Sequence, residues 1–365
     1  MKISIVLPNL KFGGAEKLHL NLAEDWCKRG HKVQFVLMSK DGEFLSLVPD
    51  KIEVISLRVN RLRSVISPLV SYFRNYQPDI ILTAMWPLTS LAVIAWIISG
   101  KVGKIFLSEH IHLTSAATNE INASKLYLKL TIFLTYRLSS GIIAVSKGVR
   151  DNLSSIGHIR KNEITVIYNP IVYKDRHQRL PHSDRIKLWG GEFSFNILSV
   201  AELKTQKDHK TLIKAISLLP DDLNIKLIIL GDGELMNELL LLIKSLNLLD
   251  KVELPGFVYD PYPWYGTADL FVLSSRWEGF GNVIVEALEC GVPVVSTDCP
   301  SGPKEILDNG NYGKLVPVGD YVALSDAINL SLNESYNRER LIKRAQDFSV
   351  PKISSEYLNY FMRSI

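Results

Sequence analysis

The sequence predicts an α/β protein made of two doubly wound domains, each built on a parallel sheet. Three observations support this fold class. Short apolar runs rich in β-branched residues recur along the chain, and amphipathic segments of helical length separate most of them. The runs form two sets in series, with a polar segment between the sets. At 365 residues the chain also exceeds the ~250–300 residues at which single cores stop growing.

The two sets of apolar runs define the expected domains. The polar segment 172–194 predicts a linker between domains 1–171 and 195–347, and residues 348–365 predict a last helix that packs back on the first domain. Ligands of doubly wound sheets bind at the carboxyl ends of the strands, so we expect two Rossmann-like domains facing a cleft. The expected strands are residues 3–8, 32–38, 52–57, 79–84, 104–109, 141–146 and 164–169, then 195–201, 225–231, 251–256, 269–275 and 292–297.

Composition narrows the classes of protein. The chain is 47% hydrophobic and 22% charged, as in globular proteins. The longest apolar stretch, 91–98, is far shorter than the ~18–20 residues that span a bilayer. The N-terminal run lacks the long apolar core and cleavage site of a signal peptide and predicts a strand. Three isolated cysteines, Cys27, Cys290 and Cys299, indicate a reducing, cytoplasmic setting.

Charge is distributed unevenly between the two halves. Residues 1–170 hold 21 basic and 12 acidic residues, whereas residues 171–365 hold 21 basic and 26 acidic ones. The basic half includes the segment 57–74, which has four arginines and no acid, and the segment 124–137, which mixes Lys125, Lys129 and Arg137 with large apolar side chains. These segments are either solvated helix faces or contacts with anionic lipid headgroups, and both interpretations stay open. No nucleic-acid-binding module accompanies the charge.

The stretch SSRWEGFGNVIVEALECGVPVV, residues 274–295, predicts a strand end, a short loop and a helix that starts near Asn282 and stops at Gly291. Glu286 lies one turn into the helix, where an acid also favours the helix dipole. Glu278 lies in the loop beside glycines, which leave the backbone bare for a ligand. The loop therefore offers N–H groups for a diphosphate and carboxylates for sugar hydroxyls.

This stretch resembles the E-x7-E region of the retaining glycosyltransferases of GT-B architecture, the "glycosyl transferases group 1" family. Four other segments also resemble sequence motifs of that family: AVSKGVRDNL (144–153), VIYNP (166–170), LGDGEL (230–235) and GKLVPVGD (313–320). The resemblance implies that Glu286 holds the nucleotide ribose and that Glu278 approaches the donor sugar. It also implies that phosphates or sugar meet the backbone N–H groups of Gly279, Phe280, Gly281 and Asn282.

Two further segments resemble parts of the family's donor-binding site. GGAEK places Gly13 and Gly14 where the family has its donor-side glycine loop, although a Gly-Gly pair also suits a plain turn. Lys207 falls where the family has a lysine that neutralises the diphosphate. Glu202 falls where most members have arginine, and a carboxylate cannot bind a diphosphate. That charge must then come from elsewhere, for example Lys204, or the leaving group is less well stabilised.

The segment KIFLSEHIH places His110 directly after a predicted strand. A lone histidine is often structural, but its position resembles that of the family histidine near the donor sugar, so we expect His110 to hydrogen-bond the sugar or acceptor region. Glu109 is an alternative polar group that could assist acceptor deprotonation. The segment CPSGPKEIL (299–307) resembles a motif of a subset of bacterial polysaccharide and lipid-linked-oligosaccharide transferases. It can also be interpreted as a plain turn with Pro303 at the start of a helix.

The resemblance implies a retaining transferase, and we expect a hexose or N-acetylhexosamine to move from a nucleotide-sugar donor to a lipid-linked or oligosaccharide acceptor. The expected donor is a UDP-sugar. No cofactor or metal is expected, because no cluster of metal-ligating residues is visible in the sequence. The expected location is cytoplasmic, peripheral at the inner face of the plasma membrane. Alternatives are a nucleotide-sugar epimerase, a non-catalytic nucleotide-sugar-binding subunit, and an NAD-dependent oxidoreductase, which would show G-x-G-x-x-G.

Overall fold

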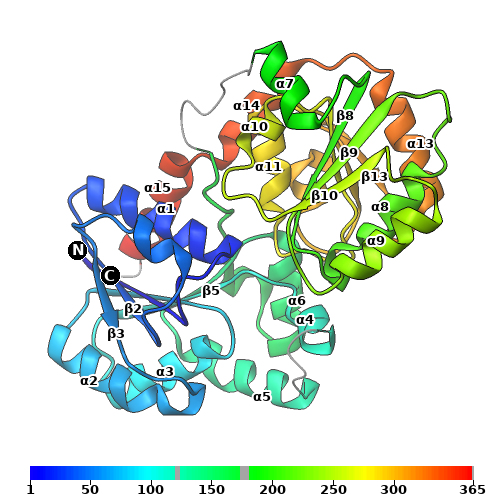
Figure 1. Cartoon of the computed structure of the whole chain (residues 1–365). Helices are drawn as coiled ribbons and strands as arrows, with labels where there is room; N and C mark the ends of the chain where they lie inside the picture. Colours follow the sequence, from blue (N-terminus) through cyan, green and yellow to red (C-terminus); the bar gives the residue numbers. More distant parts are fainter. Residues whose placement is uncertain (120–123, 173–180, 364–365) are drawn as a thin grey trace. The chain divides into compact units, whose positions relative to one another are not determined.

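The computed structural model describes residues 1–119, 124–172 and 181–363. Contacts within the chain divide it into two units. The first domain consists of residues 1–171 together with 349–365, and the second domain consists of residues 172–348. Each domain is described by itself below (Figure 1).

The first domain is built on a parallel sheet with the strand order β3-β2-β1-β4-β5-β6-β7 in the described residues. Most of its strand positions are buried, because helices cover both faces of the sheet. The strands are β1 (Lys2–Leu7), β2 (Lys32–Leu37), β3 (Glu53–Ser56), β4 (Ile80–Ala84), β5 (Lys104–Glu109), β6 (Gly141–Ala144) and β7 (Ile164–Val166).

Helices α1 and α15 lie together on one face of this sheet, and α2, α3 and α5 lie on the other (Figure 1). The ring of Trp26 on α1 lies 5.7 Å from that of Phe361 on α15, so residues from both ends of the chain share one core. The helices are α1 (Gly14–Lys28), α2 (Ile66–Tyr76), α3 (Leu88–Ile98), α4 (Leu113–Asn119), α5 (Lys125–Thr135), α6 (Lys147–Gly157) and α15 (Val350–Met362), with 3₁₀ turns at Glu43–Leu47, Leu62–Ser64, Tyr136–Leu138 and Lys161–Glu163.

The second domain has a parallel sheet with the order β10-β9-β8-β11-β12-β13. Its strands are β8 (Phe195–Val200), β9 (Ile225–Leu230), β10 (Val252–Gly256), β11 (Leu270–Leu273), β12 (Val294–Thr297) and β13 (Lys314–Val316). Its helices are α7 (His182–Trp189), α8 (His209–Ile216), α9 (Met236–Ser245), α10 (Tyr262–Tyr265), α11 (Asn282–Glu289), α12 (Pro303–Ile306), α13 (Tyr321–Leu332) and α14 (Arg338–Ala345), with 3₁₀ turns at Thr205–Lys207, Asp308–Gly310 and Gln346–Phe348.

Each sheet has a point at which the chain reverses its direction of travel across the strands. In the first domain this point lies between β1 and β4, and in the second it lies between β8 and β11. The loops that leave the two central strands there diverge toward opposite faces of the sheet, which opens a crevice at the carboxyl ends. The strand order therefore predicts where each domain can hold a ligand.

The structure corrects the prediction in two places. The segment 172–194 is wrong as a linker over its described part, because α7 packs on the second domain: Trp189 is fully buried, and its ring N–H donates to the Thr267 hydroxyl at 2.9 Å. Residues 173–180 of that segment lie outside the described residues. Strand β13 was not predicted, since only Leu315 and Val316 of its residues are apolar and Pro317 ends the run. No helix in the described ranges is both long and apolar enough to cross a bilayer.

Candidate active site

The candidate site of the second domain forms where three neighbouring strands end. Lys207 follows β8, Glu278 follows β11 and Pro300 follows β12. The Lys207 Nζ atom lies 2.7 Å from the Glu278 Oε1 atom, and the two side chains are only 17% and 7% exposed. The Ser275 hydroxyl donates a second hydrogen bond, of 2.6 Å, to the same carboxylate oxygen. Because burial penalises an unpaired charge, the lysine and the acid each compensate the other.

Neighbouring loops hold the segment between β11 and α11. The side-chain amide of Gln206 donates to the Trp277 carbonyl oxygen at 2.8 Å, and the Gln206 carbonyl oxygen accepts from the Arg276 N–H at 2.8 Å. The Glu278 N–H donates to the Pro300 carbonyl oxygen at 3.0 Å. The backbone of the acid is therefore fixed from both sides, which is the arrangement that a preorganised site requires.

Helix α11 starts at Asn282, as predicted, and two glycines shape the approach to it. Gly281 is the N-cap and has a φ of 98°, a conformation that favours glycine. A Cβ on Gly302 would lie 1.7 Å from the Phe280 carbonyl oxygen, so only glycine allows these two backbones to approach. Gly281 has no side chain to cap the helix, and its carbonyl oxygen accepts from the Ile284 N–H at 3.0 Å at the positive end of the helix dipole.

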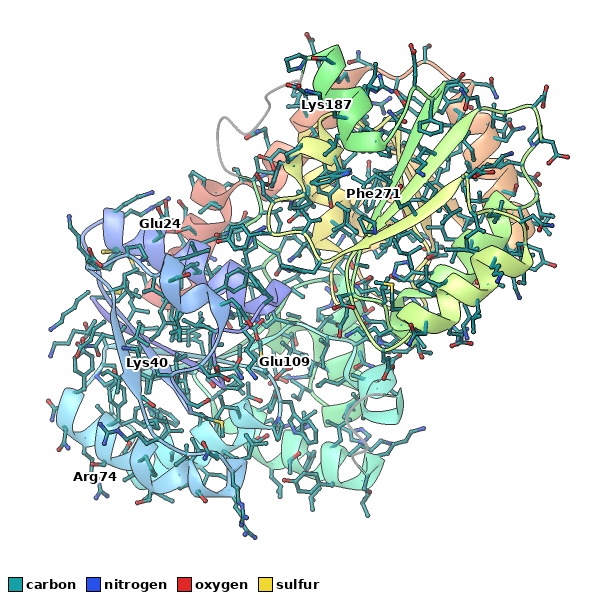
Figure 2. The ribbon with its side chains drawn as sticks, viewed as in Figure 1. Glu24, Lys40, Arg74, Glu109, Lys187 and Phe271 are labelled. Atoms are coloured by element: carbon teal, nitrogen blue, oxygen red, sulfur yellow. The ribbon has the colours of Figure 1, made fainter. Side chains whose placement is uncertain are left out.

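Glu286 is buried one turn into α11, and the Tyr265 hydroxyl donates to its Oε2 atom at 3.1 Å. Burial raises the pKa of the Tyr265 phenol well above its usual value, and the charge of Glu286 raises it further. The Tyr265 ring lies 5.6 Å from that of Phe271, a residue of the central strand β11 (Figure 2). The carboxylate predicted to hold the ribose is thus oriented from the sheet through a tyrosine.

Glu202, the residue that departs from the family pattern, lies after β8 with a side chain that is 61% exposed. Its Oε2 atom pairs with the Lys204 Nζ atom at 3.1 Å. Nearby, the backbone is closely packed, since a Cβ on Gly231 would lie 1.9 Å from the Ala201 carbonyl oxygen. Glu202 therefore directs its charge into solvent beside a lysine, whereas the Lys207 side chain is only 17% exposed.

In the first domain, the predicted glycine loop follows β1. Gly13 is the N-cap of α1, and Gly14 is the first residue of the helix. A Cβ on Gly13 would lie 2.1 Å from the Glu16 Oε2 atom, so the space that this glycine leaves is filled by a carboxylate of the same chain. Burial raises the pKa of Glu16 to about 7, and its own backbone N–H opposes that shift.

His110 lies directly after β5, with its Nε2 atom 2.9 Å from the Ser108 hydroxyl oxygen. Its ring makes an edge-to-face contact with the ring of His19 on α1, at a centroid separation of 5.1 Å. Burial lowers the pKa of His110 well below its usual value, and His19 lowers it further. The ring is therefore neutral at physiological pH and binds a partner through hydrogen bonds rather than through charge.

Glu109 is the last residue of β5 and makes its hydrogen bonds to residues other than His110. It is fully buried inside the first domain (Figure 2), and its Oε1 atom accepts from the Tyr136 and Thr89 hydroxyls. Burial raises its pKa to about 7, while the Tyr136 and Thr89 hydrogen bonds lower it. The structure thus gives Glu109 a place in a buried polar cluster of β5, α3 and the turn after α5.

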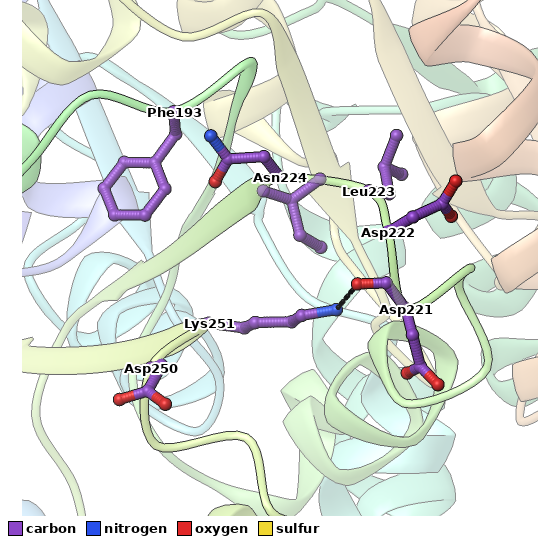
Figure 3. Close-up of a pocket in the computed structure, with 8 residues that line it drawn as sticks. Phe193, Asp221, Asp222, Leu223, Asn224, Asp250 and Lys251 are labelled. Atoms are coloured by element: carbon purple, nitrogen blue, oxygen red, sulfur yellow. Dashed lines mark hydrogen bonds between the residues drawn. The ribbon is translucent and has the colours of Figure 1, made fainter.

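A pocket of about 280 Å³ lies elsewhere in the second domain (Figure 3). Its lining residues precede β8, β9 and β10, so it opens at the amino ends of the strands, opposite the edge that carries Lys207 and Glu278. Lys251 donates there to the Asp221 carbonyl oxygen at 3.4 Å. Within the described residues, no group of three or more His, Cys, Asp or Glu side chains could hold a metal ion.

The structure places the predicted residues in two groups, one in each domain. In the second domain Lys207 contacts Glu278, the segment from Gly279 to Asn282 continues from that acid, and Glu286 follows on α11. In the first domain the glycine loop and His110 follow β1 and β5. Sequence reasoning missed Ser275, Tyr265 and His19. Ser275 stood in the quoted motif, but Tyr265 and His19 have no signal in sequence because tertiary packing alone makes them neighbours of the site residues.

Comparisons with known proteins agree with this division. Residues 12–174 match the family model "Glycosyltransferase Family 4", and residues 192–348 match "Glycosyl transferases group 1". The chain is 34% identical over 245 residues to an N-acetylgalactosamine-N,N'-diacetylbacillosaminyl-diphospho-undecaprenol 4-alpha-N-acetylgalactosaminyltransferase of Campylobacter jejuni. That match covers 66% of this chain and 65% of the relative's own length.

Two further proteins are similar over nearly the whole chain. A GalNAc-alpha-(1->4)-GalNAc-alpha-(1->3)-diNAcBac-PP-undecaprenol alpha-1,4-N-acetyl-D-galactosaminyltransferase of C. jejuni is 27% identical, and the match covers 98% of this chain and 97% of the relative. A crystal structure of Anabaena Alr3699/HepE in complex with UDP superposes with a TM-score of 0.82 at 25% identity, and it covers 98% of this chain and 99% of the other.

Proposed function

Because the chain belongs to the GT-B glycosyltransferases, with its second domain in the "Glycosyl transferases group 1" family and its first in "Glycosyltransferase Family 4", we propose that it transfers a hexose or N-acetylhexosamine from a nucleotide-sugar to a hydroxyl group of a lipid-linked glycan. The two similar C. jejuni proteins, whose names give undecaprenol-linked acceptors, support this acceptor class. The product belongs to bacterial cell-surface glycan synthesis.

One observation carries the proposal: the buried pair of Lys207 and Glu278 beside the start of α11, within the segment that matches the group 1 model. A lysine has three N–H donors, so Lys207 can keep Glu278 and still donate to phosphate oxygens. The α11 N-terminus adds the positive end of a helix dipole. Together they offset the charge that develops on the departing diphosphate, and this electrostatic stabilisation is the main catalytic contribution.

The proposed donor is a UDP-sugar. Support comes from the Anabaena structure, in which a protein with 25% identity over nearly the whole chain holds UDP. In this chain Glu286 is the proposed partner of the ribose hydroxyls, since it is buried and Tyr265 fixes one of its oxygens. Glu278 is the proposed partner of the donor sugar, and His110 that of the sugar or the acceptor.

The proposed reaction retains the anomeric configuration. The acceptor hydroxyl oxygen forms a bond to C1 of the sugar while the bond from C1 to the diphosphate oxygen breaks. The electron pair of that bond leaves with the nucleoside diphosphate, and a phosphate oxygen on the same face takes the hydroxyl proton. We propose that this step needs no metal ion, because Lys207 and the α11 N-terminus supply the positive charge.

We propose that the first domain contacts an anionic lipid surface through α5. One face of this helix buries Leu128 and Ile132, while the opposite face exposes large apolar side chains between cations. Such a combination suits a bilayer surface, where apolar groups enter the interface and each nearby cation contributes about 1 kcal/mol. On α5 the exposed apolar residues are Leu126, Tyr127, Leu130, Phe133 and Leu134 and the cations are Lys125 and Lys129, and the 3₁₀ turn that follows adds Arg137 and Leu138.

Mass spectrometry of the acceptor, after its incubation with the purified protein and a donor, tests the proposed transfer. UDP-, GDP- and ADP-sugars are first ranked by thermal shift, and the binding donors are then incubated in EDTA with polyprenyl-diphosphate-linked glycans. We expect UDP-sugars to stabilise the protein and the acceptor to gain the mass of one hexose or N-acetylhexosamine. Conversion of the donor without an acceptor would indicate an epimerase, and binding without transfer would indicate a non-catalytic subunit. Loss of transfer in EDTA would contradict a metal-independent step.

Vesicle flotation tests the proposed contact between α5 and an anionic lipid surface. We expect the protein to float with phosphatidylglycerol vesicles and not with phosphatidylcholine vesicles. Leu130→Glu should abolish flotation, since it places an acid at the centre of the exposed face. The matched control is Leu241→Glu, a change at a 69% exposed leucine on α9 of the second domain. Equal flotation of both variants would contradict the assignment to α5.

A further inference from the structure

The loop between β5 and α4 carries a second histidine, His112, to which the proposed function gives no role. The loop leaves the carboxyl end of an interior strand, and ligands of doubly wound sheets bind at that edge. The proposed function assigns the nucleotide to the second domain, through Lys207 and Glu286. The substrate left for the first domain to recognise is therefore the acceptor.

The other polar side chains at positions 108–112 are already engaged inside the domain. Ser108 and Glu109 are fully buried. His110 has its Nε2 atom 2.9 Å from the Ser108 hydroxyl oxygen, and its Nδ1 atom is enclosed by the protein. His112 differs, because it is half-buried and, within the described ranges, its Nε2 atom is neither enclosed nor hydrogen-bonded. This nitrogen is the one that the loop leaves open to a ligand.

The ring of His112 is fixed through its other nitrogen. The Nδ1 atom lies 2.8 Å from the Ser115 hydroxyl oxygen in the first turn of α4, and the Ala116 N–H donates to the His112 carbonyl oxygen at 3.0 Å. That turn is attached to α6, since the Asn152 side-chain amide donates to the Thr114 hydroxyl at 2.8 Å. An oriented ring with one open nitrogen is the arrangement that a preorganised binding residue requires.

The chemistry of the ring indicates what it can bind. Burial lowers the pKa of His112 from its usual value of 6.5, so the ring is neutral at physiological pH. The Nε2 atom of a neutral imidazole makes one hydrogen bond, as donor or as acceptor according to the tautomer. A hydroxyl group donates and accepts, so it fits either tautomer, whereas a strong hydrogen bond to phosphate needs a charged ring. The open nitrogen therefore suits a sugar hydroxyl.

We propose that His112 binds the acceptor: its Nε2 atom makes a hydrogen bond to a hydroxyl group of the acceptor glycan and holds that glycan at the carboxyl edge of the first domain. This assignment rests on the proposed function, because it needs a glycan acceptor. The competing role is structural, since His112 directly precedes α4 and contacts its first turn. The structural role uses Nδ1 and the acceptor uses Nε2, so substitutions can separate the two.

Two amide side chains make this separation. Asparagine places its amide near the position of Nδ1, so His112→Asn keeps a partner for Ser115 and removes the group at Nε2. Glutamine is longer, so His112→Gln returns a hydrogen-bonding group close to Nε2. We expect His112→Asn to raise the KM for the acceptor about fivefold, the effect of about one hydrogen bond, with an unchanged KM for the donor. His112→Gln should recover most of that loss.

His158→Asn is the matched control, the same change at an exposed histidine that caps the C-terminal end of α6. It should leave both KM values as in the wild type. A wild-type KM for the acceptor in His112→Asn would overturn the proposal and leave His112 its structural role. An increase that His112→Gln does not recover would also overturn it, because the loss would then follow from the packing of the ring rather than from Nε2.

Acylation by diethyl pyrocarbonate, which modifies accessible imidazole nitrogens, tests the contact without turnover. Peptide mass spectrometry of the wild-type protein should show that His112 is modified and that a saturating polyprenyl-diphosphate-linked glycan protects it. His158 should be modified equally with and without the glycan. Sugar transfer by a wild type in which the glycan leaves His112 unprotected would overturn the role of His112 alone. Failure of the wild type to transfer sugar to any acceptor would instead refute the proposed function.

Discussion

Lys207 and Glu278 form a buried ion pair with 2.7 Å between Nζ and Oε1, although they are 71 residues apart in sequence. The pair exists because β8 and β11 are neighbours at the point where the strand order reverses. A diphosphate that binds here meets a lysine already held by an acid and by its own loop. The lysine therefore needs little reorganisation on binding, which is what a preorganised electrostatic site provides.

The first prediction separates the stabilising role of this pair from its role in binding. Lys207→Ala should lower the free energy of unfolding by about 3 kcal/mol, because it leaves the Glu278 charge buried and uncompensated. The double variant Lys207→Ala/Glu278→Gln should recover most of that stability but not the affinity for UDP. Urea unfolding and calorimetric titration with UDP measure the two quantities. Full recovery of UDP affinity in the double variant would mean that Lys207 does not contact the diphosphate.

The second prediction concerns the tyrosine that orients Glu286. Tyr265→Phe removes the 3.1 Å hydrogen bond to Glu286 Oε2 and should weaken UDP binding about fivefold, the effect of about 1 kcal/mol. The matched control is Tyr262→Phe, which removes the equivalent 2.8 Å bond to Glu289 on the same pair of helices. Binding of 2′,3′-dideoxy-UDP should not distinguish Tyr265→Phe from the wild type. Equal effects of the two tyrosine changes on UDP binding would contradict a ribose role for Glu286.

The strands could be predicted because buried parallel strands leave continuous apolar runs in the sequence. Strand β13 was missed because its apolar run is only Leu315 and Val316 before Pro317, whereas the run at the equally short β7 continues through Ile167 and Tyr168. Helix α7 was not predicted from the sequence because tertiary contacts stabilise it: the packing of Trp189 and the ion pair between Arg185 and Asp269. A segment that is mostly polar and contains Pro181 and a Gly-Gly pair looks like a linker in sequence.

The site could be predicted only in part, for a similar reason. The glycine-containing loop after β11 identified the segment around Glu278, whereas the family resemblance identified the segments around Lys207 and His110. Tyr265, the partner of Glu286, and His19, the neighbour of His110, could not be identified. They lie on other helices, and the sequence pattern does not distinguish them from other buried residues. Glu202 departs from the family's usual arginine, and the sequence left its consequence open. In the structure its side chain is 61% exposed and pairs with Lys204.

The third prediction is a pH dependence of stability from Glu109. Its pKa is 4.5 in an ordinary setting and is raised to about 7 in the folded protein, so the folded state favours the protonated form. The stability this confers is fully present below pH 4.5 and is lost as the pH rises through about 7. Between pH 5 and 8 the free energy of unfolding should therefore fall by about 2 kcal/mol on account of this residue.

Glu109→Gln isolates that effect. Glutamine keeps the shape and cannot ionise, so the variant should lose about 2 kcal/mol less than the wild type over the same pH range. Glu16, whose pKa is also raised to about 7, titrates in both proteins and cancels in the comparison. Urea unfolding at pH 5, 6, 7 and 8 measures the difference. Parallel curves for the two proteins would show that Glu109 is already ionised in the folded state at pH 5.

The fourth prediction tests whether the loop geometry at the start of α11 depends on Gly302. A Cβ there would lie 1.7 Å from the Phe280 carbonyl oxygen, and the φ of 101° is unfavourable for any other residue. Gly302→Ala must move the Phe280 backbone, so it should cost about 3 kcal/mol of stability and weaken UDP binding at least about tenfold. Gly310→Ala is the matched control, because Gly310 has a φ of 97° but no atom within 4 Å of its Cβ position. That change should cost about 1 kcal/mol from backbone strain alone and leave UDP affinity as in the wild type. If Gly302→Ala binds UDP as tightly as Gly310→Ala does, the backbone from Phe280 to Asn282 does not contact the nucleotide.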